Sequence, residues 1–369
     1  MSLAFALIIL TACSGQVKTE EMVAVTNNSE GTLAVINSES ATEIIETTEI
    51  FDLSDVSPIE ALRKVLLNEA PFCCINTVPY ANKNIIHEYN GYLNELEIGG
   101  KSIKTPQFTI LDLDGDEVPE VVLAIENYNG SVILRYRDGK VLGNIIGYRS
   151  MYNLKKDGSF NQSGSAFESY ISKLFFVDRA IVDDENAIRI ETINETYYYL
   201  HDIPVDKNMW DKLADSFEKA ELAEWHDFSV ESINQWVVED DSVPTENERQ
   251  DYLDSLAYLL ELTYDYTSKG QEEFNIDSKQ YYYGCKDELS KIYQLCMEKL
   301  SGNKLEELEA EQQHWQETIE HRLLIDLQAN QVSDIEELDK WTIYYTYGDM
   351  LLRRTIHLVN VYYDVHFYD

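Results

Sequence analysis

The change in periodicity around Val237–Glu248 constrains the fold of this chain more than any other sequence feature. Before it, short apolar runs alternate with turn dipeptides. After it, no proline occurs from 245 to 369 and apolar residues recur at helical spacing. The stretch VVEDDSVPTENE between them has no periodicity and contains Pro244. The sequence therefore predicts an α+β protein, with a β-rich domain at 57–240 followed by an all-α helical bundle domain at 245–369.

The β-rich region begins with a helix signal and continues as strands. Ser57-Pro58-Ile59-Glu60 combines a capping box with proline at the first helical position. Asn129-Gly130 and Asp138-Gly139 separate apolar runs, which is the chemistry of tight hairpin turns. We predict an antiparallel meander over about 100–203, built from the runs QFTILDL, VPEVVLAIE, SVILRYR, KVLGNIIGY, ISKLFFVD, AIRIETI and TYYYLHDI.

Helical spacing is found on both sides of the boundary. Two helices flank the predicted meander on its C-terminal side, the second of them capped by Ser229. Beyond the boundary the pattern indicates a small bundle. The expected helices cover about 208–220, 230–237, 249–268, 276–300, 304–328, 335–340 and 347–365.

The charge balance excludes some classes of partner. The chain carries 67 Asp and Glu against 29 Lys and Arg, a net charge of -38, which repels nucleic acid and favours basic partners or divalent cations. The sequence contains no G-x-S-x-G, H-E-x-x-H, P-loop or dinucleotide-binding glycine pattern. We therefore expect a binding protein and not an enzyme.

The first residues, MSLAFALIILTACSG, are typical of a secretory signal peptide. Their apolar run is too short to span a bilayer, and Leu10-Thr11-Ala12-Cys13 resembles a bacterial lipobox. That resemblance implies cleavage before Cys13, a lipid on its thiol and anchoring at the extracytoplasmic face of the membrane. The segment 14–56, rich in Ser, Thr, Glu and Asn, is expected to be a disordered tether.

The remaining four cysteines are Cys73, Cys74, Cys285 and Cys296. None has the spacing of a metal site or of a C-x-x-C motif. Structural burial is the favoured interpretation, and a Cys285–Cys296 disulfide stays open as an alternative.

Alternating acidic residues form a candidate metal loop in the β-rich region. Asp112, Asp114, Asp116 and Glu120 occupy loop positions 1, 3, 5 and 9, and Val118 adds a backbone carbonyl. Such oxygen ligands suit Ca²⁺, although the spacing is not that of an EF-hand. The loop resembles the calcium loops of FG-GAP and integrin-type repeats, with Glu117 where glycine is usual. An acidic turn that only caps its own backbone is the alternative.

The stretch ELEAEQQHWQETIEHR supports two interpretations. Glu311 and His314 form an E-x-x-H pair of the kind found in di-iron bundles, but neither predicted neighbouring helix contains a second one. Gln312 and Trp315 lie on one apolar stripe with Leu308 and Ile319. The helix is therefore expected to carry a packing face, with Trp315 against the helix of Leu289–Tyr293.

The same residues carry a family resemblance over about 275–365. Asp287, Leu289 and Tyr293, then Leu308, Gln312 and Trp315, loosely Arg322, and a last helix with Arg353 or Arg354, resemble the motifs of the LprI-type lysozyme-inhibitor family. Ser290 stands where that family has asparagine. The resemblance implies a helical domain and a basic lysozyme as partner. The alternative is a calcium-stabilised recognition or adhesion lipoprotein that uses its β-rich domain.

Overall fold

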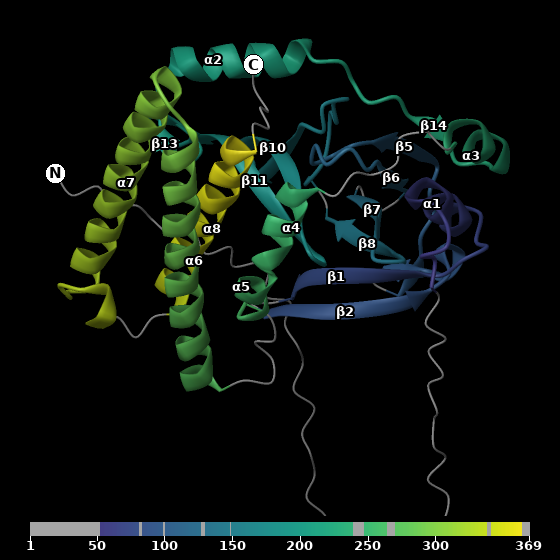
Figure 1. Ribbon diagram of the computed structural model, residues 1–369, viewed down its shortest axis with the longest axis horizontal. Coiled ribbons are helices and arrows are strands. Elements are labelled where there is room, and N and C mark those ends of the chain that lie inside the picture. Colours follow the sequence, from purple (N-terminus) through teal and green to yellow (C-terminus); the bar gives the residue numbers. More distant parts are fainter. Residues whose placement is uncertain are drawn as a thin grey trace, which may run out of the picture. The chain divides into compact units, whose positions relative to one another are not determined.

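The computed structural model describes residues 52–80, 83–98, 100–126, 130–147, 149–238, 247–263, 270–337 and 341–363 (Figure 1). Ile50–Asp369 forms one compact unit, distinct from Met1–Glu49. The expected signal peptide with Cys13, and the tether as far as Phe51, lie outside the described residues. So does the boundary expected between 240 and 245.

The first helix is confirmed where its capping signal predicts it. Helix α1 spans Pro58–Leu66, and the backbone N–H of Glu60 donates to Ser57 Oγ at 3.2 Å. Its buried face contributes Leu62 and Val65 to the hydrophobic core beneath the larger sheet. Local capping and amphipathic spacing agree here, so sequence alone places this element.

The larger sheet has seven strands in the order β14-β5-β6-β7-β8-β1-β2. Strands β5 to β8 form the expected antiparallel meander. The first two strands were not predicted, and β1 pairs with β8 in parallel, so the sheet is mixed and not purely antiparallel. Its strands are β1 (Phe72–Tyr80), β2 (Lys83–Gly91), β5 (Gln107–Leu111), β6 (Glu120–Ile125), β7 (Gly130–Arg137), β8 (Lys140–Ile146) and β14 (His226–Asp227).

The smaller sheet has five strands in the order β13-β12-β11-β10-β9 and is antiparallel throughout. The predicted single meander is therefore divided between two sheets. Its strands are β9 (Phe160–Ser165), β10 (Glu168–Val177), β11 (Ala180–Glu191), β12 (Thr196–Leu200) and β13 (Ile203–Pro204). Two short strands, β3 (Glu97–Ile98) and β4 (Lys101–Ser102), pair separately beyond the 3₁₀ turn η1 (Leu93–Glu95).

The turn chemistry of one hairpin is confirmed and that of another was missed. Asp138 and Gly139 have φ of 47° and 74° between paired Arg137 and Lys140, the backbone that a type I′ turn needs. His201 and Asp202 also have positive φ, 47° and 65°, although neither is glycine or asparagine. Their conformation is strained, so other contacts must hold it.

Those contacts come from the C-terminal helices. The His201 ring lies 4.4 Å from that of His357, centroid to centroid. The Asp202 carboxylate lies 3.7 Å from Arg353 Nε and 3.9 Å from an Arg322 guanidinium nitrogen. The β12–β13 turn therefore joins the smaller sheet to the helices.

The remaining helices confirm the predicted helical pattern with shifted ends. The last long helix begins six residues earlier than expected, and the helix expected over 249–268 is broken near Leu256. The segment 335–340 begins as the 3₁₀ turn η2 (Ile335–Glu337). The helices are α2 (Lys207–Lys219), α3 (Val230–Trp236), α4 (Glu248–Ser255), α5 (Ala257–Glu261), α6 (Gln271–Lys299), α7 (Asn303–Ala329) and α8 (Trp341–Tyr362). The α+β class is confirmed.

The helices and the smaller sheet share one hydrophobic core. Phe175, Val177 and Ile203 from the sheet belong to the same buried cluster as Trp315 and Ile356 from the helices. The β-rich and helical regions are thus distinct in secondary structure but pack as one unit.

Stability should fall at acidic pH because of the paired histidines. Burial, and the proximity of the other histidine, hold the pKa of His201 well below its usual value, and burial also lowers the pKa of His357. Below about pH 6.5 these histidines bind protons in the unfolded chain but stay neutral in the folded one, because their folded-state pKa values are lower. Stability is therefore lost as pH falls. Glu311 opposes this shift and Arg354 reinforces it.

We expect His201→Asn, which tolerates the positive φ, to lose less stability than the wild type between neutral and acidic pH. Urea unfolding at a series of pH values measures this, and exposed His321→Asn is the control. Comparing variants cancels the other titrating groups. Parallel pH profiles for His201→Asn and wild type would show that the pair does not titrate with folding.

Candidate functional site

The acidic loop joins two adjacent strands of the larger sheet. β5 ends at Leu111, which pairs with Glu120 at the start of β6. Gly115 and Glu117 both have positive φ, 78° and 67°. Glu117 therefore takes the left-handed conformation that favours glycine, at the position where the resembled calcium loops carry glycine. The loop keeps this backbone at a cost in local strain.

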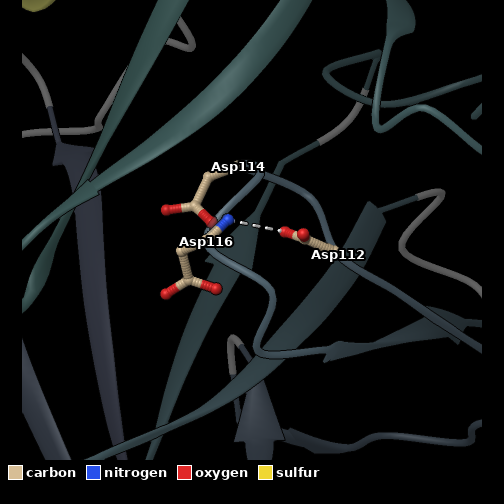
Figure 2. A group of neighbouring side chains, drawn as sticks. All are labelled: Asp112, Asp114 and Asp116. Atoms are coloured by element: carbon tan, nitrogen blue, oxygen red, sulfur yellow. Dashed lines mark hydrogen bonds between the residues drawn. The ribbon is translucent and has the colours of Figure 1, made fainter. Parts of the chain in front are cut away.

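The structure brings three of the predicted ligands together. One carboxylate oxygen from each of Asp112, Asp114 and Asp116 lies within 4.8 Å of the others (Figure 2). Asp112 Oδ1 accepts the N–H groups of Gly115 and Asp116 at 2.7 and 3.1 Å, and its Oδ2 accepts that of Glu117 at 2.9 Å. This carboxylate therefore caps the loop, as the alternative interpretation predicts. Its Oδ2 accepts only the one N–H and has a second lone pair available.

Asp114 differs from its neighbours because nothing in the described residues satisfies its carboxylate. The residue is 0% exposed, and neither Oδ1 nor Oδ2 has a hydrogen-bond partner there. Burial, reinforced by the charge of Asp116, raises the pKa of Asp114 to about 8. Burial likewise raises the pKa of Asp116 to about 6. A buried, unpartnered carboxylate is costly, so the loop alone does not explain this side chain.

Glu120 and Val118 lie beside the group but are not part of it. Glu120 is 2% exposed, and its Oε2 accepts the N–H of Leu113 at 2.9 Å. Burial and then the charge of Asp114 raise the pKa of Glu120 well above its usual value. The N–H of Val118 donates to Asp116 Oδ1 at 2.7 Å. Their roles as metal ligands stay predictions.

Side chains from the helical region hydrogen-bond to the backbone of the loop. An Arg249 guanidinium nitrogen donates to the Asp114 carbonyl at 2.6 Å, and its Nε donates to Asn360 Oδ1 at 2.8 Å. Asn247 Nδ2 donates to the Asp116 carbonyl at 3.1 Å. Sequence reasoning missed these contacts, because residues more than a hundred positions away supply them. The loop is thus held by its two flanking strands and by hydrogen bonds from the helical region. Arg249 adds a positive charge that only partly offsets the charge of the acidic group.

The predicted packing face of α7 is present. Trp315 is 3% exposed and lies in one core cluster with Leu289 and Ile356, with Tyr293 packed against it. Arg354 Nε donates to Gln312 Oε1 at 2.8 Å, and its guanidinium carbon lies 5.7 Å from the centre of the Trp315 ring. The apolar motif residues of the resembled family, with Gln312 and Arg354, therefore pack together.

The two residues of the E-x-x-H pair have different surroundings. Glu311 accepts a hydrogen bond from Arg354 and lies 3.2 Å from His357 Nε2. His314 is exposed. Within the described residues, the acidic loop supplies the only group of three possible ligands. The structure shows the packing face of this helix that the sequence predicts.

The cysteines favour the structural interpretation. Cys285 and Cys296 are both buried, and both lie on α6. Eleven residues of one helix separate them by about 16 Å, far beyond disulfide reach. The alternative of a bridge between them is therefore wrong. Asp287, on the same helix, is exposed.

These features define an α+β protein with an acidic loop able to hold a cation and a packed helical motif at its C-terminal side. In comparisons with known proteins, no family model, no curated protein and no solved structure matches the chain. Among the described helices, none combines the length and apolarity needed to cross a membrane.

Proposed function

We propose that this chain is a lipoprotein of the bacterial envelope, anchored through Cys13, that acts by binding and is stabilised by Ca²⁺ at Asp112, Asp114 and Asp116. The observation that carries the calcium assignment is the Asp114 carboxylate, which is fully buried with both oxygens unpartnered. A cation placed among the three carboxylates would offset their mutual repulsion.

Calcium is favoured over magnesium by the kind of ligands at hand. The loop offers carboxylates and backbone carbonyls in an irregular arrangement, and Ca²⁺ accepts six to eight such oxygens in flexible geometry. Val118 and Glu120 would complete the set. Extracellular modules of this kind bind with Kd of about 10⁻⁴ to 10⁻³ M, which suits the proposed location. The ion's role would be structural, since no nucleophile or catalytic motif accompanies it in the sequence.

Calorimetric titration tests the calcium site directly. We expect Ca²⁺ to bind residues 14–369 at one site, and Asp114→Asn to weaken binding by about tenfold or more, because one charged ligand is lost. Glu117→Gln is the matched control, since Glu117 is an exposed acid of the same loop outside the group. Equal affinities in Asp114→Asn, Glu117→Gln and the wild type would refute the site.

The second candidate function is inhibition of a basic lysozyme through the helical region. Its support is the motif of the resembled family, in which Gln312, Trp315 and Arg354 pack together. The excess of acidic residues favours encounter with a basic enzyme. The protein would then protect the cell wall of the cell to whose membrane it is anchored.

A turbidity assay tests this second function. Residues 14–369 at tens of micromolar are expected to slow the clearing of a cell-wall suspension by lysozyme at physiological salt. The whole chain is needed because the helices share their core with the smaller sheet. An acidic protein of similar charge, added at the same concentration, controls for simple adsorption. Clearing at the same rate with and without the protein would exclude inhibition.

A further inference from the structure

A groove lies between helices α6 and α7. It has a volume of about 880 Å³, and residues 333–335 and Leu351 also line it. Its lining residues on α7 run from Glu309 to Leu327, about 27 Å at the helical rise of 1.5 Å per residue. Apolar side chains from both helices form its floor: Tyr282, Leu289, Trp315, Ile319, Leu323 and Leu327.

The floor of the groove consists of side chains that are themselves largely buried. Tyr282, Leu289, Trp315, Ile319 and Leu327 line the groove and are each less than a tenth exposed. Arg354 donates to Gln312 from beneath the groove, which fixes the orientation of that amide. An apolar floor with a few fixed polar groups is the usual character of a binding groove.

Acidic side chains outnumber basic ones along the groove. Glu309, Glu320 and Asp334 line it against a single basic residue, Lys286. Helix α7 as a whole carries seven acidic and two basic residues. An occupant with positive charge on the sides of an apolar stripe would therefore match both the walls and the floor.

We propose that the α6–α7 groove binds an amphipathic helical segment of a partner protein, with basic residues flanking its apolar stripe. Apart from residues 333–335, the lining residues lie on helices, whose backbone groups are already paired, so an extended strand would find no edge to join there. A length of about 27 Å accommodates roughly five turns of helix. The inference rests on the proposed function only in that the chain acts by binding, and it requires neither calcium nor lysozyme.

The probe is a synthetic helical peptide of about five turns, with leucine at helical spacing and lysine beside it. Its affinity for residues 14–369 is measured by calorimetry at physiological salt. Gln316→Arg places bulk and positive charge in the groove, because Gln316 is an exposed lining residue. Gln328→Arg is the matched control, the same change on the same helix outside the groove.

We expect Gln316→Arg to weaken peptide binding about tenfold or more and Gln328→Arg to change it by less than about twofold. A peptide of the same composition with the leucines scattered should bind far more weakly than the amphipathic one. Equal losses in the two variants would show general attraction to an acidic surface and overturn the proposal, as would no binding of the amphipathic peptide. Neither outcome depends on the calcium or lysozyme assays.

Discussion

Replacing Arg249 with methionine is expected to lower the free energy of unfolding by about 3 kcal/mol, because two buried acceptors lose their donor. The side chain is nearly buried and bonds both the Asp114 carbonyl and Asn360 Oδ1. Methionine fills similar space, so the loss reports the hydrogen bonds and charge more than a cavity. Removing the guanidinium also withdraws the positive charge nearest to the acidic loop.

Chemical denaturation of residues 14–369 measures this loss. Arg189→Met is the matched control, since Arg189 is a half-exposed arginine paired with Glu191 at the surface, and it should cost less than about 1 kcal/mol. If the two variants lost equal stability, Arg249 would not join the loop to the helices. The loop and the helices belong to one compact unit, so the loss should appear as a shift of a single cooperative unfolding transition.

Replacing Trp315 with alanine is expected to cost about 3 to 5 kcal/mol of folding free energy. The indole is 3% exposed in the core shared by the helices and the smaller sheet. Its removal leaves a cavity and takes away the ring beneath the Arg354 guanidinium. The variant should therefore unfold at a lower denaturant concentration.

The control is Trp236→Ala. Trp236 is 42% exposed and stacks on His226 with ring centroids 4.2 Å apart, so its loss should cost only about 1 kcal/mol. Unfolding curves recorded by circular dichroism compare the two tryptophans directly. A small loss for Trp315→Ala would contradict the packing interpretation of the family motif.

Local signals in the sequence placed most of the elements. The Ser57 cap, the Asp138-Gly139 turn and the stripe of Gln312 and Trp315 are read from residues within one or two turns of each other, and the structure has all three. The pairing of β1 with β8 could not be predicted, because β8 lies about seventy residues further along the chain and a parallel pair is not joined by a tight turn. The hairpin of β1 with the next strand, β2, was also missed.

The candidate metal group was found from sequence because its three aspartates alternate within five residues. The difference between the environments of these aspartates could not be found from sequence, because the burial of each side chain depends on what packs over the loop. Asp112 bonds its own backbone, whereas Asp114 lies beneath elements distant in sequence and is left without a partner for its carboxylate. That contrast carries the proposed calcium site.

The sequence by itself determined the α+β class, the alternation of strands and turns, and the faces of the long helices, because capping, turn conformation and periodicity act over a few residues. Only the tertiary structure decided which of two adjacent arginines enters the core: Arg354 bonds Gln312, whereas Arg353 lies beside Asp202. Adjacent residues on a helix point about 100° apart, so the packing of distant elements selects between them.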